Sequence, residues 1–360
     1  MFQRQFFPLN SQIGLKEESI KFNNFLINQN FDECKKIIST NFYLDKTYWK
    51  RMKSRVNHIL ERKKDYKIRG KKSVIYIYWH GFWPHMNQDD CQLLDFLKEA
   101  SKGHLLKSTK KPRKADIFIS SCFGKEIISN KFDHCLKILF LGENIRPYFK
   151  NYDLSLSCDM NDYRGRNINL PLWLLEIDLF DKNKNYNDKK IYNLDLFINK
   201  KVIDFSKRKS GIVYVGNNEE PFRQTVINAM AQHIKNLQIY GSQTNPIEDK
   251  QELLRKFKGS IVFENSYYPG YITEKIIHTY LAGNISIYWG CQEGSFLKKN
   301  ALIHTITTKT DIKEIILLGK KIIRNNEKLE IPPLFEKNYI FKKKSSIINK
   351  LNQILKQFNL

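Results

Sequence analysis

The sequence lacks a long apolar run. In its 360 residues, nowhere do about 18 apolar residues follow one another, as a membrane-spanning helix requires. The N-terminal stretch MFQRQFFPLNSQIG also lacks the continuous apolar core of a signal peptide. These two absences predict a cytoplasmic protein.

Cysteine is scarce and follows no ligand pattern. The six cysteines, at positions 34, 91, 122, 135, 158 and 291, form no CxxC pair and show no spacing typical of a zinc site or a small disulfide scaffold. A reducing compartment is therefore the simpler inference. Asp89 and Asp90, with His80 and His85 nearby, do not make a convincing metal site, so we expect no metal.

Those histidines belong to an aromatic loop, WHGFWPH at 79–85. Its rings Trp79, Phe82 and Trp83 can stack on a sugar or fill a core. We expect at least one of the three to be core.

Acidic residues are few, 37 against 61 Lys and Arg, which leaves a net charge of +24. Such a field attracts phosphates, nucleic acid or an anionic membrane face. The excess is mostly Lys spread through a Lys-, Asn- and Ile-rich chain, which indicates a compositional habit rather than a binding stripe. A basic nucleic-acid-binding protein is the alternative from another class. Because the chain has no RNP-like, helix-turn-helix or zinc-finger pattern, we expect no nucleic-acid partner.

The length predicts more than one domain. Domains commonly hold roughly 100 to 200 residues, and 41% hydrophobic with 13% aromatic residues are enough for buried cores. We expect residues 1–70 to be a helical extension of unknown role. Apolar residues recur there at helical spacing in three segments, 17–28, 32–39 and 47–62.

The next two parts alternate strands with helices, which predicts an α/β fold with parallel sheets. Residues 71–190 are the first domain, with strands expected at 74–79, 116–120, 137–141 and 154–157 and a helix at 91–100. Residues 191–330 are the second, with strands expected at 211–215, 237–240, 260–264 and 285–289 and helices at 221–235, 251–257 and 273–282. The polar stretch 181–193 between them has little to bury and is interpreted as a linker.

Residues 331–360 end in a basic amphipathic helix. One face carries the apolar residues Ile347, Ile348, Leu351, Ile354, Leu355 and Phe358, and lysines occupy the other. Packing on the first domain is the commoner fate of such a helix. The alternative is peripheral contact of residues 341–360 with an anionic inner membrane face, which the Lys342–Lys344 run favours.

The most informative stretch is SIVFENSYYPGYITEKIIHTYLAGNISIYWG at 260–290. Thr273 is suited to cap a helix, Glu274 to its positive first turn, and Gly283 to a left-handed end. The first turn offers free backbone N–H groups, so an anion such as a diphosphate is stabilised there, and Lys275 strengthens the effect. In an open parallel sheet the ligand crevice lies beyond the carboxyl ends of the strands, where Glu264 and Asn265 fall.

This stretch resembles the alpha-1,3/4-fucosyltransferases of glycosyltransferase family 10, bacterial members included. Their signature is a FENS stretch, a short spacer and Y-[IV]-T-E-K. Here FENS stands at 263–266 and YITEK at 271–275, followed by IYWG at 287–290. The likeness covers about residues 70–330, and the basic-then-LPL run RGRNINLPLW at 164–173 adds to it.

The resemblance implies a GT-B fold, two Rossmann-like domains facing across a cleft, with GDP-fucose held by the second. The segment GNNEEPFR at 216–223 is similar to one in which an Asn opens a loop and an Arg closes it on the donor diphosphate. Asn217 and Arg223 take these places. From the residues alone, Arg223 reads equally well as a solvated arginine at the start of a helix.

In the first domain, KILFLGENIRPYFKNYDLSLSCD at 137–159 is similar to the family's strand, GEN loop and strand. The resemblance makes Glu143 the general base of an inverting fucose transfer to a glycan hydroxyl. The other donor-binding residues that it implies are Asn265, Tyr271, Glu274 and Lys275. Glu264 is either a donor-site carboxylate or the partner of a helix cap.

Since side chains and a helix end can stabilise the leaving group, we expect no metal or other cofactor. The acceptor is left open, whether LacNAc, another glycan such as lipopolysaccharide or a protein glycan, or a lipid-linked sugar. So is the linkage, with alpha-1,3 the first expectation. A GT-B transferase for another nucleotide sugar is the nearest alternative.

Overall fold

The computed structural model describes residues 18, 21–22, 24–25, 28, 30–41, 46–69, 74–124, 130–183, 185–186, 189–216, 220–241, 245, 247–291, 302–358 and 360. These residues form two compact units. Unit 1 comprises the described residues of Met1–Leu170, Asn185–Lys190 and Lys343–Leu360. Unit 2 comprises those of Pro171–Lys184 and Ile191–Lys342. The chain crosses between the units more than once. The domain boundaries expected from the sequence, at 70, 190 and 330, stay a prediction.

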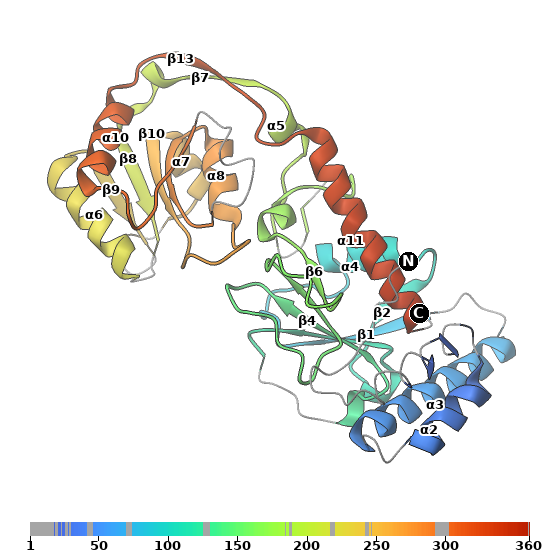
Figure 1. The fold of residues 1–360 in the computed structure, drawn as a ribbon. Helices are drawn as coiled ribbons and strands as arrows, with labels where there is room; N and C mark the ends of the chain where they lie inside the picture. Colours follow the sequence, from blue (N-terminus) through green and yellow to red (C-terminus); the bar gives the residue numbers. More distant parts are fainter. Residues whose placement is uncertain are drawn as a thin grey trace. The chain divides into compact units, whose positions relative to one another are not determined.

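Unit 1 is built on a parallel sheet of six strands, in the order β2-β1-β3-β4-β5-β6 (Figure 1). The strands are β1 Val74–His80, β2 Leu105–Ser108, β3 Ile117–Ser121, β4 Leu136–Leu141, β5 Leu154–Ser157 and β6 Asn167–Asn169. β3, β4 and β5 are buried along their whole length. Strands buried on both faces need continuous apolar runs, which is why the sequence predicted them.

The two edge strands of this sheet, β2 and β6, were not predicted from the sequence. β2 is mostly exposed and therefore carries no apolar pattern. β6 is Asn-Ile-Asn, and its buried Asn167 is held by side chains instead. The Asn167 Oδ1 atom accepts hydrogen bonds from the hydroxyls of Ser155 and Ser157, each at 2.8 Å. A strand satisfied by side-chain hydrogen bonds leaves no apolar signature.

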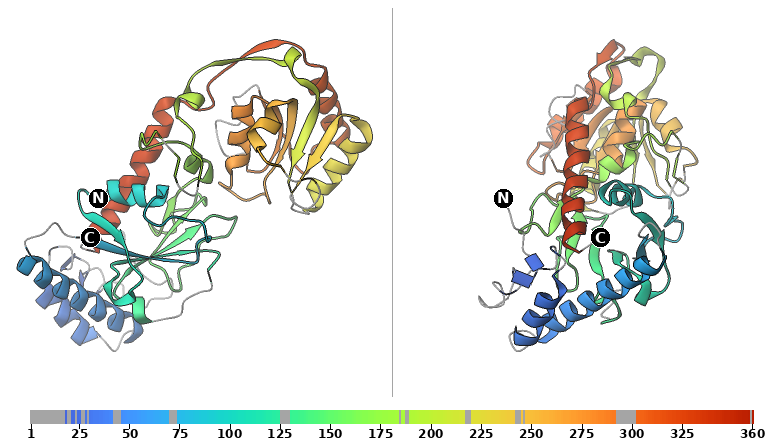
Figure 2. Two further views of the ribbon diagram at one scale, coloured as in Figure 1. Left: turned by 180° about the vertical axis from the view of Figure 1, so that it is seen from behind. Right: turned by 90° about the vertical axis from the view of Figure 1, so that its right-hand side faces the viewer.

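The N-terminal helices belong to unit 1. α2 (Phe31–Asn41) and α3 (Lys46–Arg69) lie side by side (Figure 2) and share an apolar cluster around Trp49. Two arginines of α3 tie it to the rest of the unit. Arg51 pairs with Asp153 at 2.5 Å, and the Arg55 guanidinium lies 3.0 Å from the centre of the Phe358 ring. The expected helices are thus present, and the extension is packed onto the first sheet.

The C-terminal helix α11 (Lys337–Gln357) packs its apolar face into unit 1. Its buried residues are Ile347, Leu351, Ile354 and Leu355, and Phe358 follows them; Ile348, expected on the same face, is only partly buried. The Asn352 side chain donates a hydrogen bond to the Ala100 carbonyl at 2.5 Å, at the end of α4 (Gln92–Ala100). Packing is therefore the fate of this face. Within the described residues, no helix is long and apolar enough to cross a membrane.

The stretch expected to be a linker is anchored instead. Tyr186 is buried in unit 1, and its hydroxyl donates to Asp95 at 2.8 Å. Ile191 is also buried, and the Tyr192 N–H donates to the Glu176 carbonyl in unit 2. Two buried side chains are enough to hold this polar segment in place. The polar composition of the segment did not indicate them.

Unit 2 repeats the architecture with five parallel strands, in the order β12-β11-β10-β8-β9. They are β8 Lys209–Val215, β9 Leu237–Tyr240, β10 Phe257–Phe263, β11 Ile285–Trp289 and β12 Ile303–Thr305. α6 (Pro221–His233) and α10 (Ile312–Arg324) cover one face, and α7 (Lys250–Arg255) and α8 (Glu274–Ala282) the other (Figure 1). An antiparallel ribbon of β7 (Lys201–Asp204) and β13 (Lys328–Ile331) and the short helix α5 (Asp195–Ile198) complete the unit. Short 3-10 helices among the described residues are η1 Pro112–Lys114 and η2 Asn130–Phe132 in unit 1, and η3 Leu172–Glu176 and η4 Phe205–Lys207 in unit 2.

Both sheets share one strand order. In each, the first strand lies between the second and the third, so the direction of winding reverses between the first strand and the third. That reversal falls between β1 and β3 in unit 1 and between β8 and β10 in unit 2. Ligands of open parallel sheets bind outside the carboxyl ends of the strands at this reversal. In unit 2 these ends are Val215 and Phe263.

Candidate functional site

Helix α8 begins at the carboxyl edge of the second sheet, and its two ends are held in the way that the sequence predicted. Thr273 is the N-cap, with its hydroxyl accepting from the Lys275 N–H at 3.4 Å. Gly283 ends the helix at φ 74°. The C-terminal carbonyls accept hydrogen bonds from two cations that the sequence analysis did not find, Lys201 on Tyr280 and Arg208 on Ala282 at 2.7 Å. Basic residues at the C-terminus of the helix stabilise its dipole, and the positive end of that dipole lies at the carboxyl edge of the sheet.

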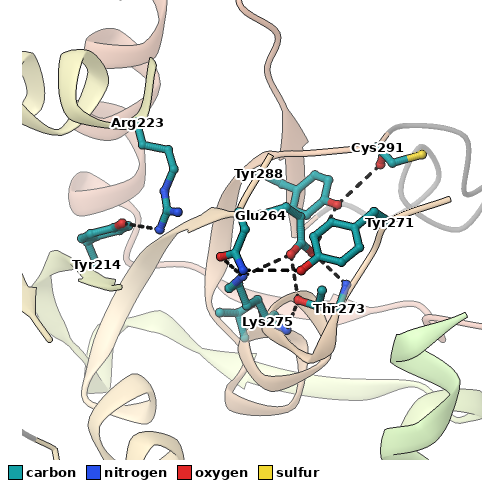
Figure 3. Close-up of polar contacts among 10 residues, drawn as sticks. Tyr214, Arg223, Glu264, Tyr271, Thr273, Lys275, Tyr288 and Cys291 are labelled. Atoms are coloured by element: carbon teal, nitrogen blue, oxygen red, sulfur yellow. Dashed lines mark hydrogen bonds and ion pairs between the residues drawn. The ribbon is translucent and has the colours of Figure 1, made fainter. Parts of the chain in front are cut away.

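Glu264 directly follows β10 and is 0% exposed. Its carboxylate accepts from the Thr273 N–H at 2.9 Å and from the Thr273 hydroxyl at 2.7 Å (Figure 3). Burial raises the pKa of the Glu264 carboxyl, and Lys275 opposes this shift. The geometry is that of a helix-cap partner, since both oxygens are engaged in holding the N-terminus of α8.

Lys275 bridges the strand and the helix. Its Nζ atom lies 3.3 Å from the Glu264 Oε2 atom and donates to the Asn265 Oδ1 atom at 3.1 Å (Figure 3). The Asn265 amide in turn donates to the Tyr271 hydroxyl at 3.5 Å. The structure therefore brings together four of the residues that the sequence singled out. Lys275 keeps part of its surface, 20% of the side chain, open to solvent.

Arg223 lies in the first turn of α6, which follows β8, and is 1% exposed. Its Nη2 atom donates to the Tyr214 hydroxyl at 2.7 Å. The Nε and Nη1 atoms are buried and have no hydrogen-bond partner among the described residues. The reading of Arg223 as a solvated arginine is therefore wrong. A buried guanidinium with unused donors is costly unless an acceptor completes it.

Glycine at position 216 gives Arg223 its room. A Cβ atom there would lie 2.5 Å from the Tyr214 hydroxyl and 2.9 Å from the Arg223 Nη2 atom. Figure 3 shows two groups of contacts, Arg223 with Tyr214 and the cluster around Glu264. They come from β8 and β10, the two strands that flank the reversal.

Two residues of this region escaped the sequence analysis. Tyr214, which holds Arg223, sits in an apolar strand where a tyrosine reads as core. Lys250, at the start of α7, is near Glu274 and Lys275, and burial lowers the pKa of its amine while Glu274 opposes the shift. A lysine directly after the capping Asp249 was the available signal for Lys250.

Two more residues were expected to bind the donor substrate, Glu274 and Asn217. Glu274 is half-buried in the first turn of α8. Asn217 lies outside the described residues. No group of three His, Cys, Asp or Glu suited to a metal occurs among the described residues, and metal independence stays a prediction.

Glu143 follows β4 at the carboxyl edge of the first sheet and is half-buried. Burial raises the pKa of the neighbouring Cys122 thiol, and the charge of Glu143 adds to the shift. Large apolar side chains near these strand ends are exposed, with Phe123 at 58% and Trp83 at 39%. Of the aromatic loop, Trp79 is buried, which confirms that at least one ring is core.

Solved structures share this architecture. A crystal structure of an alpha1,3-fucosyltransferase with GDP matches with a TM-score of 0.52 at 20% identity, covering 79% of this chain and 92% of that one. Another alpha1,3-fucosyltransferase structure gives 0.51 at 18% identity, covering 78% and 91%. The chain has the fold of the GT-B glycosyltransferases, as the sequence predicted.

The sequence places it more narrowly. Residues 77–176 match the alpha-(1,3)-fucosyltransferase FucT N-terminal domain, and residues 205–328 match the C-terminal domain of glycosyltransferase family 10 (fucosyltransferase). Together the matches span more than half of the chain, which belongs to glycosyltransferase family 10. The alpha-(1,3)-fucosyltransferase FucT of Helicobacter pylori is 27% identical over 193 residues. That alignment covers 46% of this chain and only 39% of the relative's length.

Proposed function

We propose that this protein transfers L-fucose from GDP-beta-L-fucose to a hydroxyl of a glycan acceptor, by inversion and in alpha-1,3 linkage. One observation carries the proposal. A buried arginine, two of whose nitrogens have no hydrogen-bond partner among the described residues, stands at the reversal of the second sheet, in the same unit as Lys275 at the start of α8. Family membership supplies the sugar and the nucleotide.

The leaving group is the first requirement of such a transfer. As the bond between the fucose C1 atom and the diphosphate oxygen breaks, negative charge grows on GDP. Preorganised cations and N–H groups stabilise that charge without reorganisation. We assign the role to Arg223, Lys275 and the first turn of α8, with Asn265, Tyr271, Glu274 and Asn217 on the sugar, nucleotide or ribose.

The acceptor is the second requirement. Its hydroxyl oxygen attacks C1 from the face opposite the diphosphate, so the beta donor gives an alpha product. The hydroxyl proton must pass to a base, and we assign it to the Glu143 carboxylate. Its place at the end of a parallel strand supports this role. The exposed Phe123 and Trp83 are suited to the apolar faces of sugar rings.

Calorimetry with GDP tests the donor site before any acceptor is known. We expect the wild type to bind GDP and Lys275→Ala to bind at least about tenfold more weakly, since one charge-assisted contact to phosphate is lost. Lys256→Ala is the matched control, because Lys256 is an exposed lysine of the same unit paired with Glu252. No GDP binding by the wild type would end the proposal. A panel of nucleotide sugars then tests the preference for fucose.

Three finer features belong to the same proposal. Transfer should proceed unchanged in a chelator, because the cations of the protein replace a metal. We propose a protein of the cytoplasmic side, with lipopolysaccharide or protein glycans among the acceptors to test. Contact with anionic lipid would have to use the lysines of α11, since its apolar face is buried. If vesicle binding is equal before and after Lys342→Gln and Lys344→Gln, that contact is absent.

A further inference from the structure

A large pocket lies beside α3 in unit 1, with a volume of about 910 Å³. One wall is α3, and the others are the segments that precede β3 and β4. Because Glu143 follows β4, the pocket is at the opposite edge of the same sheet. We call it the α3 pocket. It is therefore separate from the residues assigned to fucose transfer.

The charge of its lining is one-sided. Lys110, Lys111, Arg113 and Lys131 line the pocket, and Glu61 is the one carboxylate among its described lining residues. Cations gathered around one cavity repel each other and raise the local concentration of anions. The lining is thus suited to a ligand that brings negative charge.

A second observation points to a ligand inside the pocket. His134 lines it, and the His134 Nε2 atom is buried without a hydrogen-bond partner among the described residues. Burial lowers the pKa of His134 to about 4, and His58 adds to the shift. A polar group that enters the pocket is one way to satisfy a neutral imidazole nitrogen that has no partner among the described residues.

The neighbouring histidine is held rigidly. The His58 Nε2 atom lies 2.8 Å from the Asp116 Oδ1 atom, and the Asp116 Oδ2 atom accepts from the Tyr76 N–H at 2.8 Å. The rings of His58 and His134 lie 4.5 Å apart. Asp116 thereby holds His58 of α3, a lining residue of the pocket, against the sheet.

We propose that the α3 pocket binds a phosphate monoester, carried by a small molecule or by a lipid headgroup. Phosphate offers three acceptor oxygens and nearly two negative charges to several cations at once. The volume lies within the range of roughly 300 to 1,000 Å³ that is common for small-ligand sites. A concave site of this size favours such a group over duplex nucleic acid.

The test is calorimetry of the full chain with glucose 6-phosphate, in the presence of saturating GDP. We expect binding that glucose does not reproduce. Arg113→Gln and Lys131→Gln, both exposed residues, should each weaken it about tenfold or more. Lys107→Gln makes the same charge change on exposed β2 outside the lining and should leave it unchanged, as should Lys275→Ala.

The source of the phosphate is separated with vesicles of phosphatidylcholine, with and without phosphatidic acid. Displacement of glucose 6-phosphate by phosphatidic acid vesicles alone supports a lipid headgroup, and no displacement supports a soluble ligand. The proposal is overturned if glucose 6-phosphate does not bind, or if Arg113→Gln and Lys107→Gln bind it equally. It is also overturned if a short RNA binds and all three charge variants weaken it alike, since that reports only the basic field.

Discussion

The two units present different chemistry on sheets of the same strand order. At the reversal in unit 1 two backbones meet, because a Cβ atom on Gly81 would lie 2.2 Å from the Gly124 Cα atom. At the reversal in unit 2 stand a buried arginine, a capped helix and a lysine. The strand order decides where a ligand can bind, and the side chains at the strand ends decide which ligand. In the second unit the basic side chains of Arg223 and Lys275 lie near the strand ends. In the first unit a carboxylate, Glu143, follows β4, and exposed aromatic rings follow neighbouring strands.

The sharpest test of that division is Glu143→Gln. If the first unit supplies only the base, transfer should fall by about 100-fold to 10,000-fold, because the isosteric amide cannot take the proton. GDP affinity, measured by calorimetry, should stay that of the wild type. Glu99→Gln, an exposed carboxylate of the same unit, is the control. Wild-type transfer rates in Glu143→Gln would remove Glu143 from the mechanism.

In the second unit, Arg223→Met removes the buried guanidinium while nearly keeping its volume. Transfer should fall about 100-fold, as when one preorganised donor to a developing charge is lost. Weakened GDP binding should accompany it. Tyr214→Phe deletes only the hydroxyl that holds Arg223 and should cost less than about tenfold. If Arg223→Met and Tyr214→Phe lowered the transfer rate equally, the guanidinium would have no role beyond its contact with Tyr214. Circular dichroism shows whether either variant is misfolded.

Replacing one glycine in each unit compares how well the two backbones tolerate an added Cβ atom. Gly81 at φ 67° faces the Gly124 backbone, whereas Gly283 at φ 74° faces the end of the Ile203 side chain, 2.4 Å from an added Cβ atom. We expect Gly81→Ala to lower the free energy of unfolding by about 3 kcal/mol and Gly283→Ala by about 1 to 2 kcal/mol, because a side chain can move and a backbone cannot. Gly103→Ala, at φ 99° with nothing within 4 Å, isolates the backbone strain. Urea unfolding measures all three.

The last comparison is a difference in pH dependence. Burial lowers the pKa of His134 in unit 1 from 6.5 to about 4, so the folded state binds fewer protons than the unfolded state between these values. Wild-type stability should therefore fall, relative to His134→Gln, as the pH drops from 6.5 toward 4.

Lys201 in unit 2 gives an effect of the same sign in a higher pH window. Burial lowers its pKa from 10.5 to about 7, and Arg208 contributes. Stability should rise, relative to Lys201→Met, as the pH increases from 7 toward 10.5. Unfolding midpoints across both windows check the pair, and parallel curves for variant and wild type would contradict either shift.

The sequence analysis predicted most elements in which burial left an apolar pattern, but it missed α10, where Ile315, Ile316 and Ile322 are buried at helical spacing. β5, β9 and β11 were predicted to the residue, and the caps Thr273 and Gly283 were found from residue type alone. β2 and β6 were missed because an exposed edge strand and a short strand with one buried asparagine carry no such pattern. The anchoring of the stretch expected to be a linker was missed for a related reason, since Tyr186 and Ile191 are single anchors in polar surroundings.

Only part of the candidate site could be predicted from the sequence. The local pattern around Thr273 fixed α8 and Lys275, because capping depends on adjacent residues. The burial of Arg223 could not be predicted, since it depends on Tyr214 and Gly216 in a neighbouring strand. The α3 pocket was invisible for the same reason, as it joins α3 to segments more than 50 positions further along.

The packing of α11 has a consequence for how the protein is made. Unit 1 cannot complete its core until Phe358 has left the ribosome, long after β6 has been synthesised. Domains usually fold as units during synthesis, the earlier before the later. Here the earlier unit must wait for the later one, and a nascent chain stopped before α11 leaves the apolar residues of unit 1 that this segment covers exposed to chaperones and to misassembly.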